Sequence, residues 1–338
     1  MPNIMNIHKI SLFSFIVIQI SALISPVTAS AQKQARLRPS QTVLLYSDSF
    51  ECNVDPIHGK EIVHADMQME VSNGLFGPEK INAKGTIANI SDLARVDLYF
   101  PKKPNGQMIV VCPGGGYKNV SALNEGLYVA DWMVSKGITV AVVKYRMPAG
   151  HWEVPLIDVQ NAFRYCRANA KDWKIDQIGV MGFSAGGHLA ACASNLYTDD
   201  ITRPDFSVLI YPVITFDPNI YSSGTRLQLI GDDSKWEDNV SKHKELLEYY
   251  SMEKRVTSDT PPTFLSHCTN DPTIVDNSLL YYKSLLMNKV PAEMHIWKSG
   301  GHGWGFSSEK FKGKGNDKFS AHRKEFYTVL ERWLEGMK

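Results

Sequence analysis

Short apolar runs alternate along the chain with longer segments in which apolar residues return every three or four positions. The short runs have the length of β-strands and lie at Arg95–Phe100, Met108–Val111, Ile138–Val143, Ile178–Phe183, Phe206–Tyr211, Thr263–His267 and Ala292–Trp297. The longer segments have helical spacing and lie at Asn124–Lys136, Leu156–Ala170, after Ser184, and at Lys242–Tyr250, Asn277–Asn288 and Arg323–Met337. Apolar strands separated by crossover helices predict an α/β fold, in which helices flank both faces of a mostly parallel central sheet.

Two parts of the chain depart from this alternation. Residues 32–94 mix polar and apolar positions with turn signals, and they predict short strands and loops of the same domain as residues 95–338. Residues 213–256 are irregular and partly charged. They predict an insertion over the edge of the sheet, which is either a roof above a site or a plain peripheral crossover.

The first 31 residues have the layout of a secretory signal peptide. Lys9 precedes the apolar run Ile10–Ile24, and Ala29-Ser-Ala31 ends the segment. We therefore expect cleavage near Ala31 and a mature protein that is secreted or periplasmic, with no stable membrane anchor. An uncleaved anchor is the alternative.

Composition excludes several kinds of partner. Lysine and arginine total 36 against 35 acidic residues, a formal net charge of +1, so no nucleic acid and no anionic membrane is expected to bind. No cysteine or histidine spacing typical of a metal site occurs, so no metal is expected. The cysteines are odd in number and widely spaced, which does not indicate a disulfide framework, although one bridge stays open: Cys52, Cys112, Cys166, Cys192 and Cys268.

The stretch Gly182-Phe-Ser184-Ala-Gly186 stands between a predicted strand and a predicted helix. This is the G-x-S-x-G pattern of a nucleophile elbow, a sharp turn that lifts a serine hydroxyl above the sheet. Its glycines allow backbones to approach closely on both sides of the turn. The alternative is an ordinary strand-to-helix turn with a capping serine.

A nucleophilic serine needs a base and an acid that orients the base. In chains with this elbow the order is serine, acid, histidine. Asp271 follows the strand Thr263–His267, with Asp276 as the alternative acid or the cap of the next helix. His302 lies in a glycine-flanked loop after the last strand and is the predicted base. Three other histidines are predicted to be structural: His188, His267 and His295.

The glycine run Pro113-Gly-Gly-Gly-Tyr117 follows an early central strand. Glycines let backbone N–H groups point at a developing oxyanion, so Gly115 and Gly116 are the predicted donors, together with the N–H of Ala185. A phosphate cradle is the alternative, but the run lacks both the Gly-Lys-Ser/Thr ending and the GxGxxG spacing. Serine, base, acid and oxyanion loop together predict acyl transfer to water through an acyl-serine, without a cofactor.

These motifs, with Asn124-Glu125-Gly and Lys144-Tyr-Arg146-Met-Pro, resemble the α/β-hydrolase superfamily from about Arg95 onward. More narrowly, they resemble the secreted acetyl-xylan-esterase-like carbohydrate esterases. Pro113 stands where the related lipase and esterase branch has histidine, which favours the carbohydrate side. The resemblance implies a serine esterase that removes acetyl groups from plant polysaccharides such as xylan.

Further residues near the motifs have a binding and a structural interpretation. Tyr117 and Trp304 are candidate substrate contacts, and core packing is the alternative for Trp304. Glu125, Tyr145 and Arg146 either shape the entrance of the site or form internal hydrogen bonds and ion pairs. Asp158 is predicted to be an acid in the first turn of its helix.

Four other functions share part of this pattern. A general short-chain carboxylesterase has the same machinery and is the main alternative. A prolyl-oligopeptidase-like peptidase would usually carry a large extra domain before Arg95. The roughly 60 residues before Arg95 leave no room for such a domain. A glycoside hydrolase would need two carboxylates across a sugar cleft. An inactive binding module would lack one of the catalytic residues, whereas the nucleophile Ser184, the acid Asp271 and the base His302 are all present.

Overall fold

The computed structural model describes residues 38–45, 80–82, 85–90, 94–148, 151–221, 224–231, 233–307 and 318–338, without the side chains of 233–235. The predicted signal peptide, its cleavage near Ala31 and Cys52 lie outside these residues, as does most of 32–94. None of the helices in the described ranges combines the length and the apolar character that a membrane crossing requires.

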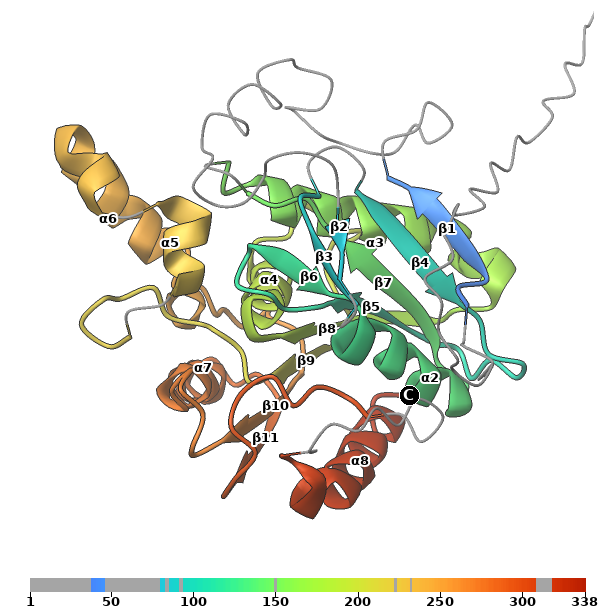
Figure 1. Cartoon of the computed structure of the whole chain (residues 1–338). Helices are drawn as coiled ribbons and strands as arrows, with labels where there is room; N and C mark the ends of the chain where they lie inside the picture. The colour runs from blue at the N-terminus through green and yellow to red at the C-terminus, as the bar shows by residue number, and fades with distance from the viewer. Residues whose placement is uncertain are drawn as a thin grey trace, which may run out of the picture. The chain divides into compact units, whose positions relative to one another are not determined.

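An eight-stranded sheet forms the centre of the fold (Figure 1). Its strands, from one edge to the other, are β1 (Gln41–Leu44), β4 (Arg95–Tyr99), β7 (Thr139–Lys144), β5 (Gln107–Cys112), β8 (Gln177–Phe183), β9 (Ser207–Ile210), β10 (Thr263–Cys268) and β11 (Ala292–Trp297). Strand β4 pairs antiparallel with both β1 and β7, and every pairing from β7 to β11 is parallel. The mostly parallel sheet predicted from the sequence is confirmed.

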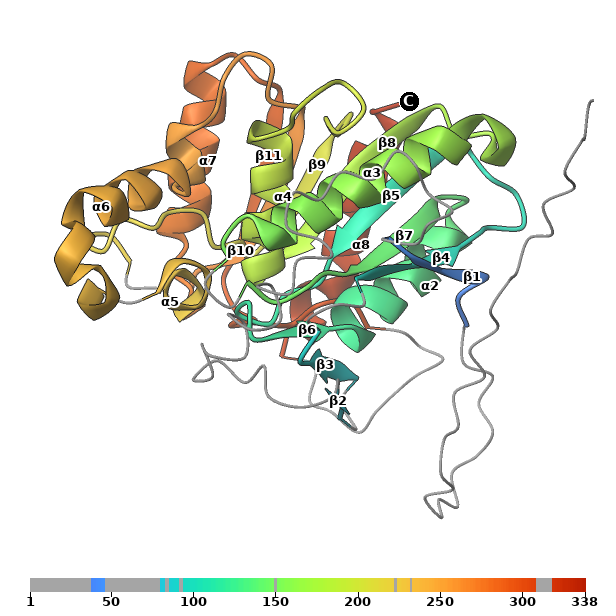
Figure 2. The same cartoon turned by 90° about the horizontal axis from the view of Figure 1, so that it is seen from above.

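Helices cover both faces of this sheet (Figures 1 and 2). One face carries α2 (Tyr128–Ser135) and α8 (Ser320–Glu335), and the other carries α3 (Val154–Trp173), α4 (Ser184–Asn195) and α7 (Asp276–Met287). Alternate residues of a central strand therefore enter different cores: Val110 packs with α3 and α4, whereas Val111 packs with α2 and α8. Every residue of β5 and β7 is buried, because both faces of the sheet are covered.

The helix predicted over Asn124–Lys136 begins differently from the expectation. Residues Leu123–Leu127 form a π-helical turn, η2, and the α-helix α2 starts only at Tyr128. The turn buries Glu125 and brings Gly126 against the sheet, where a Cβ on Gly126 would lie 3.0 Å from Val142 Cγ1. Periodicity alone does not predict such a turn.

Three short strands pair beside the glycine loop: β2 (Lys80–Ile81), β3 (Thr86–Ala88) and β6 (Asn119–Ser121). The segment after β9 contains α5 (Gly224–Ile230), η3 (Asp233–Asn239), α6 (Val240–Tyr249) and η4 (Met252–Lys254). Its last part returns to the domain, because Met252 N–H donates to the Ile214 carbonyl and the Tyr250 carbonyl lies 2.9 Å from His188 Nε2. The hydroxyl of Tyr221 lies 3.5 Å from Thr273 Oγ1, so the insertion also reaches the turn after β10.

The four described cysteines are buried free thiols: Cys112, Cys166, Cys192 and Cys268. Burial raises the pKa of the Cys166 thiol to about 12. Within the described residues no disulfide forms.

Candidate active site

Ser184 stands on the sharp turn between β8 and α4. Its φ angle of 53° lies in the left-handed region, which is uncommon for a residue with a side chain. The flanking glycines are required by close backbone contacts: a Cβ on Gly182 would lie 2.0 Å from the Gly186 carbonyl oxygen, and one on Gly186 would lie 2.1 Å from that of Cys112. The local geometry is that of a nucleophile elbow rather than an ordinary capped turn.

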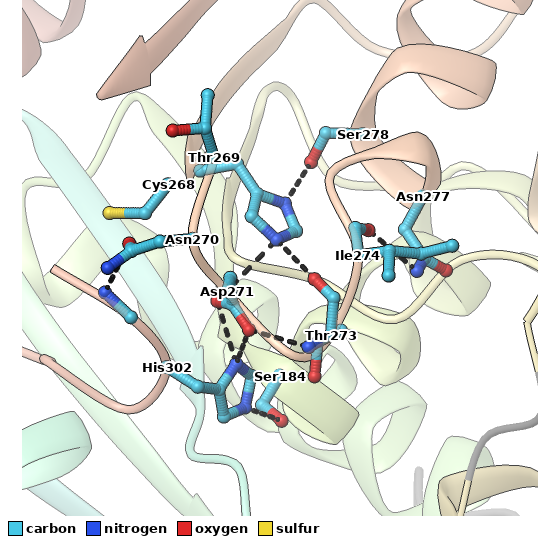
Figure 3. A network of polar contacts seen from close by, with 12 residues as sticks. Ser184, Cys268, Thr269, Asn270, Asp271, Thr273, Ile274, Asn277, Ser278 and His302 are labelled. Atoms are coloured by element: carbon cyan, nitrogen blue, oxygen red, sulfur yellow. Dashed lines mark hydrogen bonds and ion pairs between the residues drawn. The ribbon is translucent and has the colours of Figure 1, made fainter. Parts of the chain in front are cut away.

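His302 connects Ser184 to Asp271 (Figure 3). Its Nε2 lies 2.7 Å from Ser184 Oγ, and its Nδ1 lies 2.9 Å from each oxygen of the Asp271 carboxylate. An ionised carboxylate only accepts hydrogen bonds, so Nδ1 carries the proton and Nε2 accepts from the serine hydroxyl. The three residues follow β8, β10 and β11, and the carboxyl ends of parallel strands meet at one edge of the sheet.

The turn that follows Asp271 fixes the position of its carboxylate. Its Oδ1 accepts from the N–H of Thr273 at 2.7 Å, and its carboxylate is fully buried. His267 supports the turn, because its Nε2 lies 2.6 Å from the Thr273 carbonyl oxygen and its Nδ1 lies 2.8 Å from Ser278 Oγ. Burial lowers the pKa of His267, which favours the neutral ring. Asp276, the alternative acid, instead lies in the first turn of α7.

The other two histidines are also engaged in structural contacts. The His188 ring is buried in α4, with Nδ1 3.0 Å from the Tyr117 hydroxyl, and burial lowers its pKa to about 4. His295 lies within β11, 2.7 Å from Glu293 Oε1.

The glycine loop lies directly over the nucleophile. A Cβ on Gly114 would come within 3.0 Å of Ser184 Cβ, and one on Gly115, where φ is 140°, within 2.0 Å of the Asn119 carbonyl oxygen. Across the described part of the chain, no acceptor takes the N–H groups of Gly115, Gly116 or Ala185. The glycine loop, whose Gly114 lies against Ser184, and the first turn of α4 therefore keep backbone N–H groups without an acceptor in the described chain, as an oxyanion site requires.

Tyr117 and Trp304, the candidate substrate contacts, have buried side chains, which favours packing in the core over contact with substrate. Tyr117 is 2% exposed, and its hydroxyl is used by His188. Trp304 is 7% exposed and stacks on Phe319, with ring centroids 3.9 Å apart. Both rings belong to the hydrophobic cores, because burying their large apolar surface is favourable.

Glu125, Tyr145 and Arg146, for which the sequence left open a role at the entrance of the site or in internal contacts, form internal contacts in the structure. The Arg146 guanidinium and the Asp158 carboxylate form a buried ion pair with an N–O distance of 2.6 Å. Asp158 is the fifth residue of α3, so the prediction of a first-turn acid was wrong. The Tyr145 hydroxyl donates to the Pro113 carbonyl at 2.7 Å, and Glu125 accepts the N–H of Gly114 at 2.7 Å.

One residue beside the site was missed by the sequence analysis. Tyr211 directly follows β9, and its ring centroid lies 4.9 Å from that of His302. Its φ of 36° is unusual for a residue with a side chain. The available signal was its position at a strand end, which it shares with the residues that the motifs identified.

Comparisons with known proteins find a matching family and curated relatives. The BD-FAE family model matches residues 96–285. A curated relative, the acetylxylan esterase of Xylanibacter ruminicola, is 35% identical over 67% of this chain and 47% of its own length. The endo-1,4-beta-xylanase B of Butyrivibrio fibrisolvens is 31% identical over 60% of this chain and 33% of its own. The chain thus spans half or less of the length of these relatives.

A solved structure extends the likeness to nearly the whole chain. The acetyl ester-xyloside bifunctional hydrolase from Caldicellulosiruptor lactoaceticus is 28% identical, with a TM-score of 0.62 over 90% of this chain and 98% of that one. The family match covers more than half of the chain and includes the serine turn. The chain has the α/β-hydrolase fold and belongs to the BD-FAE family.

Proposed function

We propose that this protein is a serine esterase that removes acetyl groups from acetylated plant polysaccharide such as xylan. The observation that carries the proposal is the continuous contact from Ser184 Oγ through the His302 ring to the Asp271 carboxylate. A relative named as an acetylxylan esterase supports the substrate class.

The proposed reaction begins when Ser184 Oγ attacks the acetyl carbonyl and His302 Nε2 takes the hydroxyl proton. Asp271 keeps the imidazole in the required tautomer and stabilises its positive charge. The oxyanion forms beside the free N–H groups of Gly115, Gly116 and Ala185, which stabilise it. The ester bond then breaks, and the sugar oxygen leaves with the proton from His302.

The second half returns the enzyme to its starting state. A water molecule gives a proton to His302 and attacks the acetyl carbonyl on Ser184. The second oxyanion collapses, Ser184 recovers its proton from His302, and acetate leaves. Only an acyl group and protons move, so the reaction needs no cofactor.

Secretion is part of the proposal. The N-terminal 31 residues have the features of a signal peptide, and an acetylated plant polymer is met outside the cell. N-terminal sequencing of the exported protein tests this directly. A first residue at or close to position 32 supports it, whereas retention of the apolar run at Ile10–Ile24 would contradict it.

Acetate release from acetylated xylan tests the substrate. The exported protein is compared with Ser184→Ala, with an aryl acetate as a second substrate. Release from the polymer that is lost in Ser184→Ala supports the proposal. Turnover of the aryl acetate alone would favour a general short-chain carboxylesterase, and turnover of neither would contradict esterase activity on acetyl groups.

A further inference from the structure

Glu125 is a buried acid that the proposed reaction does not use. It lies in the π-helical turn η2 beneath the glycine loop, and it is 4% exposed. Its Oε2 accepts the N–H of Gly114 at 2.7 Å, and its Oε1 accepts the hydroxyl of Tyr211 at 2.8 Å. One carboxylate therefore binds two segments of the site that are far apart in the sequence.

Tyr211 continues this connection to the loop of the base. Its hydroxyl accepts the N–H of Gly305 at 2.8 Å, three residues after His302. Having accepted from Gly305, the hydroxyl gives its single proton to Glu125. The Tyr211 ring also lies against the His302 ring. A hydrogen-bonded path thus runs from Gly114 through Glu125 and Tyr211 to Gly305.

The pattern of donors requires an acceptor on both oxygens of Glu125, which an ionised carboxylate supplies. Burial raises the pKa of Glu125 above its ordinary value, and the hydrogen bonds from Tyr211 and Gly114 and the nearby His302 offset only part of this effect. Among the neighbouring groups, the Tyr145 hydroxyl donates to the Pro113 carbonyl oxygen, and Arg323 of α8 donates to the carbonyl oxygens of Gly305 and Trp304.

We propose that Glu125 is a positioning residue that holds the glycine loop and the histidine loop together across Ser184. Fixing the Gly114 N–H restrains the start of the glycine loop, in which the N–H groups of Gly115 and Gly116 have no acceptor among the described residues. Fixing Gly305 restrains the loop that carries His302. The oxyanion donors and the base then act on one carbonyl, which is the preorganisation that acyl transfer needs. The inference rests on the proposed esterase function.

Two variants test the connection at different points. Glu125→Gln keeps the shape, but its amide has only one acceptor oxygen, so either the Gly114 N–H or the Tyr211 hydroxyl loses its acceptor. Tyr211→Phe keeps the acid and breaks the path to Gly305. Tyr281→Phe is the matched control, because Tyr281 is also fully buried and its hydroxyl accepts from Asn195 Nδ2, away from the site.

We expect Glu125→Gln to lower kcat for an aryl acetate about 10- to 100-fold with little change in KM, the scale of a misplaced oxyanion donor. Tyr211→Phe lowers kcat in the same manner, and the double variant loses little more than the worse single one, since both break one path. Tyr281→Phe keeps the kcat of the unaltered protein.

The pH profile separates positioning from a merely structural role. Glu125→Gln removes a negative charge that favours the protonated imidazole, so the acid limb of kcat/KM moves to lower pH. Tyr211→Phe keeps that charge and leaves the limb in place. If the variants lose only thermal stability, with kcat and the pH profile unchanged below the melting temperature, the inference is wrong.

The ester turnover of the unaltered protein, measured beside Ser184→Ala, separates a failure of the proposed function from a failure of the inference. If the unaltered protein does not turn over the ester, the proposed function fails and the inference fails with it. If the unaltered protein turns over the ester, and Glu125→Gln and Tyr211→Phe are both as active as the unaltered protein, only the inference fails. Should Glu125→Gln not fold, Tyr211→Phe against Tyr281→Phe decides the question alone.

Discussion

Gly186 lies directly beneath the backbone of Cys112, and a Cβ at this glycine would come within 2.1 Å of the Cys112 carbonyl oxygen. The first turn of α4 is therefore packed backbone to backbone against the end of β5. Since the serine turn begins α4 and the glycine loop follows β5, this contact sets the distance between nucleophile and oxyanion donors. The spacing of the site is a property of close packing as well as of hydrogen bonds.

Gly186→Ala should destabilise the protein strongly, because its methyl group would displace backbone atoms that cannot move independently. We expect a loss of about 3 kcal/mol or more in the free energy of unfolding, within the range of severe core overpacking. Urea unfolding measures it. Gly224→Ala is the control, since nothing lies within 4 Å of a Cβ there. A small effect at Gly186 would mean that the two backbones are not in contact.

Ser184→Ala and His302→Ala should each abolish ester turnover, because neither the nucleophile nor its base works without the other. The expected loss in kcat is on the order of a millionfold for each. The double variant should lose no more than either single variant, as groups that act in one step are not additive. Steady-state kinetics with an aryl acetate measures this, and additive losses would contradict the shared step.

Asp271→Asn should lower kcat roughly 10⁴-fold, because an amide no longer keeps the imidazole in the tautomer that accepts from serine. Asp276→Asn, five residues later in the first turn of α7, should keep its activity. The pair is measured side by side on one ester. Equal activity of the two variants would show that the carboxylate contacting His302 does not orient it.

Trp304→Ala should cost stability rather than substrate affinity. The ring is buried against Phe319, so we expect a loss of about 3–5 kcal/mol in the free energy of unfolding. The KM for acetylated xylan at a temperature where the variant is folded should not change. A stable variant with a raised KM would restore the sugar-contact interpretation.

The pH dependence of stability should contain a contribution from His188. Its pKa is about 4 in the folded protein, because burial disfavours the charged ring, against an ordinary value of 6.5. The unfolded chain binds the proton more readily between these values, so stability is full above pH 6.5 and falls as the pH drops towards 4. The size is about 3 kcal/mol at most, from the free energy of a pKa unit.

Denaturant unfolding at pH 7 and at pH 4 measures this contribution. His188→Gln should be less stable at pH 7, because the ring stacks on Phe216 and contacts Tyr117, but it should lose less stability than the unaltered protein on acidification. An equal loss in both proteins would assign the acid sensitivity to other groups.

The sequence by itself determined the layer architecture and the three residues that meet in the site. Apolar strands buried on both faces leave a strong signal, and the carboxyl ends of parallel strands converge, so residues just after β8, β10 and β11 had to lie together. The sequence also predicted the roles of Gly182 and Gly186, because only glycine permits the close approach of backbone segments that the turn requires.

Only the tertiary structure decided which way the remaining side chains point. Trp304 follows a glycine-flanked loop, where no periodicity separates an inward ring from an outward one, and its stacking on Phe319 settled the matter. The ion pair of Arg146 with Asp158 and the bond from Tyr211 to Glu125 join segments 12 and 86 residues apart. Such pairings depend on how strands and helices pack, and the local pattern of a chain holds no information about its distant partners.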